Sequence, residues 1–159
     1  MMKKLFAIII LAAVPLLALC GNRIVVSKKA LMLYVINEKN DTIFQRSIAC
    51  GEKLGNKTEI GDKRTPEGEF EITKMYDATS WKHDFGDGKG MRLGAYGPLF
   101  FRLNVPGFND IGIHGTIFPE SIGTRSSEGC IRMRNEDIKA LYPYCYIGMP
   151  VTIEKDELE

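Results

Sequence analysis

Short strand-like segments, separated by glycine-rich polar stretches, make up most of this sequence, and only one segment carries a clear helical pattern. Sixteen glycines are spread over the 159 residues. A chain of this length supports one domain, and its 45% hydrophobic content is ordinary for a protein with a buried core. We therefore expect a single, mainly β domain with one or two short helices and long loops.

The segments expected to be strands are rich in β-branched and aromatic residues. The first is R-I-V-V-S at 23–27, and the second, at 30–37, has apolar side chains on both faces, as in a strand covered on both sides. A polar turn at 38–41 leads to a return strand at 42–50, which predicts a hairpin. Residues 69–72 alternate polar and apolar side chains, which is typical of a half-buried strand. Further strands are expected at 99–103, 111–113 and 151–153.

The stretch from residue 77 to 97 contains five glycines and is too long for a simple connection. Loops of this length in compact domains often form lids or binding loops. His83 is expected to be exposed there, and Trp81 and Tyr96 are candidates for lining a cleft.

A short helix is expected after the last glycine-cysteine segment. Asn135 is placed to cap it, acidic residues follow at its positive end, and Pro143 stops it. The charged tail at 155–159 is expected to be solvated.

Residues 1–20 have the composition of an export signal. Lys3 and Lys4 precede a 15-residue apolar run, which is short for a transmembrane helix and suits a secretory signal. The run ends in L-A-L-C, which resembles the lipobox of bacterial lipoproteins, although Leu19 stands where a small residue is usual. We expect export and a membrane tether through a lipid on Cys20, with ordinary cleavage after Cys20 as the alternative.

Charge and cysteine spacing argue against two classes of partner. Lys and Arg number 21 against 20 Asp and Glu, and no basic stripe with interleaved aromatics occurs, so nucleic acid is not an expected partner. The sequence has no C-x-x-C pair and no metal-type histidine spacing, so we expect no metal site. Cys50 and Cys145 are interpreted as small buried apolar residues.

One histidine and one cysteine stand out because each lies beside a glycine, 16 positions apart, at His114 and Cys130. A thiol is a strong nucleophile only as thiolate, and a neighbouring imidazole commonly deprotonates it. The glycine at 129 allows close approach to a ligand, and its amide and that of Cys130 are candidates to face an oxyanion. Taken alone, the pair is equally consistent with a strand-end histidine that is satisfied by the backbone.

The motifs around this pair resemble the L,D-transpeptidase catalytic domain (YkuD type). H-G-T at 114–116, S-E-G-C-I-R-M at 127–133 and T-P-E-G-E-F-E-I at 65–72 match three ordered elements of that family. Glu128 departs from it, because many members have histidine directly before the Gly-Cys pair; we expect Glu128 to be a solvent-facing loop residue.

The resemblance implies a YkuD-like β-sandwich or barrel-like sheet over residues 22–154, acting in the bacterial cell envelope, at the periplasmic or outer surface. It implies that Cys130 is the nucleophile, that His114 is the base and that the backbone carbonyl of Gly115 orients the imidazole. Gly129 would contribute to the oxyanion hole, and the remaining substrate-binding residues would be Ser127 and Arg132. No cofactor is implied.

The implied reaction is acyl transfer from a tetrapeptide stem of peptidoglycan to an acceptor amine in the cell wall. The same site would be an L,D-carboxypeptidase if water resolved the acyl-enzyme. Two other classes stay open: a catalytically silent wall-binding module tethered at Cys20, and a secreted domain in which Cys130 is bridged to Cys145.

Overall fold

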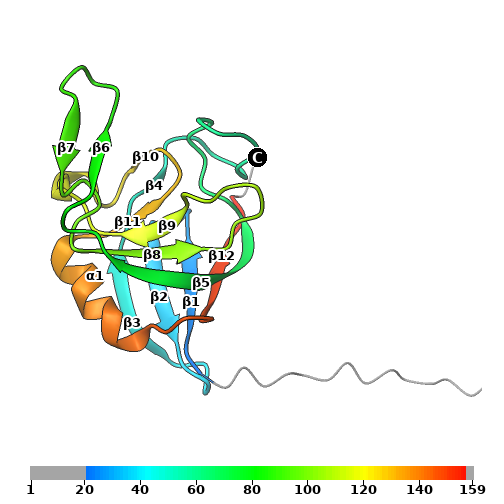
Figure 1. The fold of residues 1–159 in the computed structure, drawn as a ribbon. Helices are drawn as coiled ribbons and strands as arrows, with labels where there is room; N and C mark the ends of the chain where they lie inside the picture. Colours follow the sequence, from blue (N-terminus) through cyan, green and yellow to red (C-terminus); the bar gives the residue numbers. More distant parts are fainter. Residues whose placement is uncertain (1–20, 157–159) are drawn as a thin grey trace, which may run out of the picture.

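The structure is a computed structural model that describes residues 21–156. The expected export signal and Cys20 lie outside the described residues, as do residues 157–159. The main feature is an eight-stranded sheet with the strand order β11-β9-β8-β5-β12-β1-β2-β3 (Figure 1). Its strands are β1 (Arg23–Ser27), β2 (Met32–Ile36), β3 (Thr42–Ser47), β5 (Gly68–Asp77), β8 (Leu99–Leu103), β9 (Gly112–His114), β11 (Ile131–Arg132) and β12 (Pro150–Ile153).

Two small sheets and three helical segments complete the described part of the chain. The pair β4–β10 lies next to the open end of the main sheet, and the β6–β7 hairpin stands away from the body (Figure 1). Their bounds are β4 (Cys50–Gly51), β10 (Arg125–Ser127), β6 (Lys82–Asp84) and β7 (Met91–Leu93). The helical segments are η1 (Pro119–Ser121), α1 (Asn135–Leu141) and η2 (Tyr142–Tyr144). No described helix is long and apolar enough to span a membrane.

The main sheet curls until its two edges nearly meet. The long strand β5 pairs with β12 through its first half and with β8 through its second half, with an irregularity between Ile72 and Lys74 where the strand bends. Beyond the end of β3, Ala49 exchanges two backbone hydrogen bonds of 2.9 Å with Arg132 in β11. The expected barrel-like sheet is therefore confirmed.

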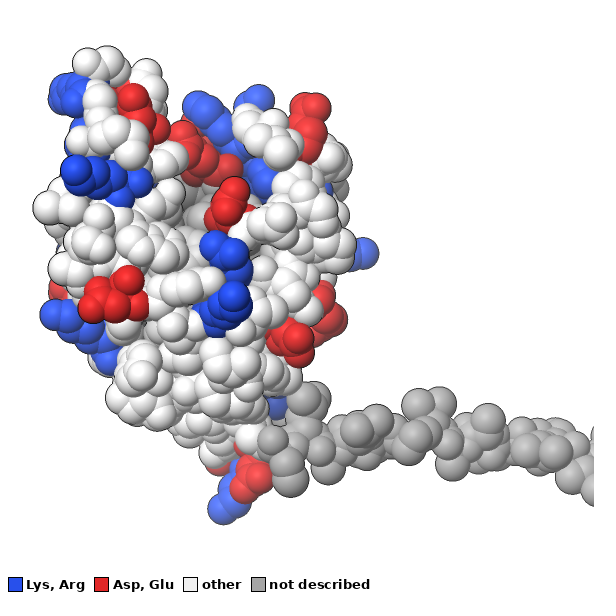
Figure 2. Space-filling model, in the orientation of Figure 1, with Lys and Arg blue, Asp and Glu red and all other residues white. Residues whose placement is uncertain are grey.

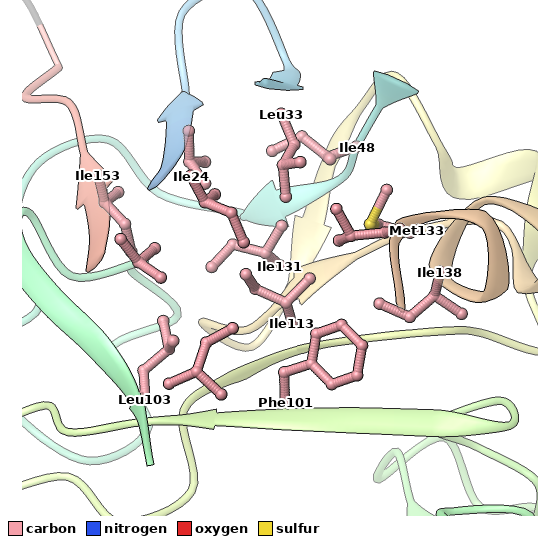
Figure 3. Close-up of a cluster of buried hydrophobic side chains, with 14 of the residues drawn as sticks. Ile24, Leu33, Ile48, Phe101, Leu103, Ile113, Ile131, Met133, Ile138 and Ile153 are labelled. Atoms are coloured by element: carbon pink, nitrogen blue, oxygen red, sulfur yellow. The ribbon is translucent and has the colours of Figure 1, made fainter. Parts of the chain in front are cut away.

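The core fills the inside of this curl with β-branched and aliphatic side chains. Figure 3 shows side chains from opposite strands, including Ile24, Leu33 and Ile113, converging with Ile138 of α1. These four side chains are fully buried. Burial of each aliphatic side chain of this size contributes about 1.5–3 kcal/mol. The alternation of apolar and polar side chains in a short strand is therefore sufficient to determine which face of the strand packs against the core.

The expected strands at 23–27, 99–103 and 151–153 are present, and the 30–37 and 42–50 segments form the expected hairpin through β2 and β3. The second strand is not covered on both sides, however. Leu33 and Val35 are fully buried, whereas Met32, Tyr34 and Ile36 on the other face are only half-buried.

Two local expectations were wrong. The 77–97 stretch is not a plain loop, because it contains the β6–β7 hairpin, whose strands are only three residues long and whose first strand is polar throughout. Asn135 begins α1 but does not cap it through its side chain. Its Oδ1 instead accepts a hydrogen bond of 2.9 Å from the backbone N–H of Thr116.

The C-terminal tail is also less solvated than expected. Asp156 is buried, and it forms ion pairs with Arg125 and, at 2.8 Å, with the Nζ atom of the fully buried Lys28. Lys28 binds Glu67 as well, at 2.7 Å. A buried ammonium needs such partners, and this cluster connects the tail to the loops that precede β5.

Candidate active site

A cavity of about 590 Å³ opens at the end of the curled sheet, between the β6–β7 hairpin and the loops at 57–63 and 107–110. Figure 2 shows the surface hollowed beside the hairpin, with both acidic and basic side chains on its walls. Four of the residues expected in the site line this cavity: Cys130, His114, Ser127 and Arg132. The fold therefore brings the histidine and the cysteine to one place.

His114 ends strand β9, and its side chain is buried with only one ring edge left for chemistry. Its Nδ1 atom donates a hydrogen bond to the Gly115 carbonyl oxygen at 2.5 Å, so the neutral ring carries its proton on Nδ1 and leaves Nε2 as an acceptor. The ring stacks on Phe100 at 5.4 Å between centroids, and the edge of Tyr96 contacts it at 4.9 Å. Burial lowers the pKa of His114 to about 3, so the imidazole is neutral at rest.

Cys130 is the last residue of the loop at 127–130, which we call the nucleophile loop after the role that the sequence predicts for this cysteine. Its Sγ donates a hydrogen bond to the Asp110 carbonyl oxygen at 3.2 Å. Burial raises the pKa of the Cys130 thiol to about 11, although a hydrogen bond from the Gly112 backbone and the charge of Arg132 oppose this rise. These shifts favour a neutral thiol beside a neutral imidazole in the protein without substrate.

Ser127 fixes the turn of the nucleophile loop from within. Its hydroxyl donates to the Cys130 carbonyl oxygen at 2.6 Å and accepts from the Gly129 N–H at 3.2 Å. Gly129 has φ +142°, a conformation that favours glycine, and a Cβ atom there would lie 2.9 Å from the Arg64 carbonyl oxygen. Because its amide is used inside the loop, Gly129 is not available as an oxyanion donor in this conformation.

Two other backbone amides are better placed for that task. The Gly112 backbone lies close enough to the Cys130 sulfur to lower the pKa of the thiol. Within the part of the chain that the structure describes, the Cys130 N–H has no protein acceptor. Backbone donors that are fixed before the reaction suit a developing oxyanion.

The turn after His114 is packed too tightly for any side chain at Gly115. A Cβ atom at Gly115 would lie 2.3 Å from Asn135 Oδ1 and 2.9 Å from Pro98 Cδ. The Asn135 amide thus holds the turn that carries the Gly115 carbonyl, and this carbonyl in turn holds the imidazole. The Asn135 side chain therefore stabilises the turn after His114 and does not cap helix α1.

Arg132 supplies positive charge to the cavity from strand β11. Its guanidinium is mostly buried, donates to the Ser126 carbonyl oxygen at 3.3 Å and packs over the Phe85 ring at 5.7 Å. No carboxylate among the described residues forms an ion pair with it. A guanidinium in this setting suits a carboxylate ligand.

A model of the protein family described as the L,D-transpeptidase catalytic domain (YkuD) matches residues 21–153. The chain belongs to this family. YqjB of Bacillus subtilis, which is named as an L,D-transpeptidase, is 30% identical over 136 residues, covering 84% of this chain and 71% of YqjB.

Solved structures agree with this L,D-transpeptidase assignment at the level of the fold. The Bd1075 protein of Bdellovibrio bacteriovorus is 26% identical with a TM-score of 0.59, over 83% of this chain and 47% of that one. The catalytic domain of an L,D-transpeptidase from E. faecium is 20% identical with a TM-score of 0.60, over 84% of this chain and 97% of that domain. This chain thus spans about half of the Bdellovibrio protein and nearly all of the E. faecium domain.

The remaining thiols of this L,D-transpeptidase domain leave Cys130 unbridged. Cys50, Cys130 and Cys145 are all free, which removes the disulfide-bridged alternative. Cys50 is fully buried, as expected, whereas Cys145 is only partly so. Burial raises the pKa of both thiols, and neither of them lines the cavity that holds His114.

Sequence reasoning missed part of the cavity wall. His83 is not simply exposed: it lines the cavity and contacts both Tyr96 and Glu128. Tyr96 lines the cleft as anticipated, whereas Trp81 lines a neighbouring groove. Asp110 went unnoticed because its contribution to the thiol is a backbone carbonyl, which no residue pattern reveals.

Proposed function

We propose that this protein is a peptidoglycan L,D-transpeptidase of the bacterial cell envelope, with Cys130 as its nucleophile. One observation carries the proposal: Cys130 and His114 line the same cavity, and the Gly115 carbonyl holds the imidazole with Nε2 free to accept a proton. The family assignment supports the reaction class, and the residue roles are our inference.

The first half-reaction forms an acyl-enzyme. The Cys130 sulfur attacks the carbonyl carbon that follows the L-centre of the third stem residue, while His114 Nε2 takes the thiol proton. The C–N bond to the terminal D-alanine then breaks, and His114 returns the proton to the leaving amine. The raised pKa of the thiol and the lowered pKa of the imidazole favour a proton transfer that accompanies the attack of the sulfur.

The surrounding groups have distinct proposed roles in this step. The amides of Cys130 and Gly112 stabilise the oxyanion, and Ser127 holds the loop that presents the sulfur. Arg132 binds a carboxylate of the stem, because it is the cavity's mostly buried cation without a carboxylate partner among the described residues.

In the second half-reaction an acceptor amine attacks the thioester, which forms an amide crosslink and releases Cys130. Export to the envelope, and a lipid tether on Cys20, follow from the sequence of residues 1–20 as proposals only. The proposed partners are the peptide stems of the cell wall, since the family acts on them.

The experiment is to incubate the purified protein with a defined disaccharide-tetrapeptide and to separate the products by liquid chromatography and mass spectrometry. The proposal expects a crosslinked dimer that has lost one D-alanine, and no product with the Cys130→Ala variant. Tripeptide alone would identify an L,D-carboxypeptidase instead. Unchanged substrate would favour a silent wall-binding module and contradict the proposal.

A further inference from the structure

A hydrogen-bonded chain of three side chains lines the cavity on the hairpin side. The hydroxyl of Tyr96 lies 3.1 Å from His83 Nδ1, and His83 Nε2 lies 2.9 Å from Glu128 Oε2. The three residues come from different parts of the chain: the hairpin, the segment that follows it and the nucleophile loop. The chain therefore joins the hairpin to the loop that carries Cys130.

This chain has one consistent set of donors and acceptors. Burial raises the pKa of Tyr96 to about 12, so its hydroxyl keeps its proton and can donate it to His83 Nδ1. In the tautomer that carries its proton on Nε2, His83 then donates to Glu128. The Glu128 carboxylate is thus held in one orientation by His83.

This carboxylate is accessible and close to the reacting sulfur. Glu128 precedes Cys130 by two residues, and 53% of its side chain is exposed, on a residue that lines the cavity. Its Oε2 atom binds His83, and Oε1 has no partner among the described residues. A cationic ligand in the cavity can therefore bind Glu128 without breaking the bond to His83.

Two carboxylates line the cavity, Glu128 and Asp110, and of these two only Glu128 is held by a hydrogen bond to another side chain among the described residues. The basic side chains of the cavity are already accounted for. Lys57 is paired with Asp62 at 2.8 Å, and Lys63 with Glu52 at 2.7 Å. Arg132 is assigned above to a substrate carboxylate. The reaction proposed for this site has a second substrate, an amine that is an ammonium ion near neutral pH, and an oriented carboxylate matches its charge.

We propose that Glu128, positioned by His83 and Tyr96, binds the ammonium group of the acceptor amine and directs its nitrogen toward the acylated Cys130. This inference rests on the proposed transpeptidase function and deepens it. In the step itself the bound ammonium loses one proton to solvent, and its nitrogen forms the new C–N bond. The C–S bond breaks, and a second proton passes from the nitrogen through His114 Nε2 to the Cys130 thiolate.

The proposal also accounts for the departure of Glu128 from the motif seen in many family members. The nucleophile loop supplies the carboxylate, and the imidazole next to it comes from the hairpin as His83. In this acceptor site Glu128 supplies the charge, and His83 fixes the orientation of the carboxylate.

The test measures how the acyl-enzyme partitions between aminolysis and hydrolysis, as the ratio of aminolysed donor to tripeptide at increasing acceptor concentration. This ratio does not depend on how fast the acyl-enzyme forms. Two acceptors are compared: a primary alkylamine, which is an ammonium ion at neutral pH, and hydroxylamine, which is mainly uncharged there. The variants are Glu128→Gln and His83→Gln, with Glu38→Gln in the distant β2–β3 turn as the matched control.

Glu128→Gln keeps the shape and the hydrogen bond to His83 but removes the charge. We expect it to lower the aminolysis ratio for the alkylamine about two- to fivefold, as befits a half-exposed charge pair, with no change for hydroxylamine. His83→Gln should give a smaller loss with the same selectivity, and Glu38→Gln should match the wild type.

Two results would overturn this inference in a Glu128→Gln variant that still forms the acyl-enzyme. One is an aminolysis ratio equal to that of the wild type, and the other is an equal loss for both acceptors. A wild-type protein that forms no acyl-enzyme would overturn the proposed function as well, so the two failures are distinguishable. Thermal melting of each variant checks that folding is intact, and Glu128 is an exposed loop residue whose replacement should not disturb it.

Discussion

The Thr65 hydroxyl donates a hydrogen bond of 2.8 Å to the Gly129 carbonyl oxygen and accepts one of 2.8 Å from the Gly51 N–H. Thr65 is fully buried, and 64 residues separate it from Gly129. The threonine of the T-P-x-G segment thus fixes the nucleophile loop from behind, while Ser127 fixes it from within. This contact explains how the T-P-x-G segment, which lies far upstream of Cys130 in the sequence, supports the loop that carries it.

Thr65→Val keeps the shape of the side chain and removes both hydrogen bonds. Leaving buried backbone groups unsatisfied costs about 1–3 kcal/mol, so we expect a lower free energy of unfolding and slower acylation of Cys130. Urea denaturation and acylation kinetics measure the two effects. Thr152→Val is the control, since its hydroxyl bonds to Glu69 at the surface of β12; equal losses in both variants would contradict the proposed clamp.

Gly129→Ala tests whether the nucleophile loop depends on its backbone conformation. The alanine would have to adopt φ +142°, which side chains disfavour, and its Cβ atom would lie 2.9 Å from the Arg64 carbonyl oxygen. We expect the two effects together to cost about 1–3 kcal/mol and to displace Cys130. Gly123→Ala has φ +89° but no atom within 4 Å of the new Cβ, so it isolates the backbone term. If acylation rates for the two variants fall equally, close packing at Gly129 is not what positions the sulfur.

The resting state of Cys130 makes a prediction about pH. Because burial raises the pKa of the thiol to about 11, its thiolate fraction at neutral pH is about a hundredfold below that of an ordinary cysteine. Alkylation of Cys130 by iodoacetamide in the absence of substrate should rise steadily from pH 6 to 9, without an inflection. Peptide mapping separates Cys130 from Cys50 and Cys145, and an inflection between pH 5 and 7 would indicate a resting thiolate–imidazolium pair instead.

Asp62 gives a prediction about the stability of the cavity wall. Its carboxylate binds Lys57 Nζ and the backbone N–H groups of Thr58 and Arg64, and these bonds hold its pKa well below the ordinary value although burial opposes them. A lowered carboxyl pKa stabilises the fold above pH about 4 and loses that contribution as the pH falls below it.

Asp62→Asn should therefore lower the free energy of unfolding by about 2 kcal/mol at pH 7, with a smaller difference at pH 3. Asp137→Asn, which breaks the partly exposed pair with Arg46, should cost less than about 1 kcal/mol. Urea denaturation of the two variants at both pH values measures this. A difference for Asp62→Asn that does not shrink at low pH would show that the ionised carboxylate is not the stabilising species.

Much of the fold was predictable because local pattern and burial agree. The segment 99–103 became β8 without a shift in its bounds, since it is apolar enough to be buried in any mainly β arrangement. The β6–β7 hairpin was missed because His83 and its neighbours are polar and half-exposed, so no alternation identifies them. The burial of Asp156 was missed because it depends on Lys28, 128 positions away.

The candidate site divides in the same way. Residue type alone left His114 and Cys130 ambiguous, and the motifs around them, together with the position of Gly115, predicted their place in one site. The contact between His83 and Glu128 spans 45 positions and exists only because the hairpin folds over the cavity. The engagement of the Gly129 amide by Ser127 depends on a backbone angle, which a sequence pattern does not encode.

The most direct test of the account is the intact mass of the protein after brief incubation with a tetrapeptide donor and acid quenching. We predict a covalent adduct equal to the donor minus D-alanine, located on Cys130 by peptide mapping, and its absence in Cys130→Ala. His114→Gln should slow its formation by about 10²–10⁴-fold, the range expected for loss of a general base. An adduct that persists in Cys130→Ala, or that maps to Cys50 or Cys145, would contradict the account.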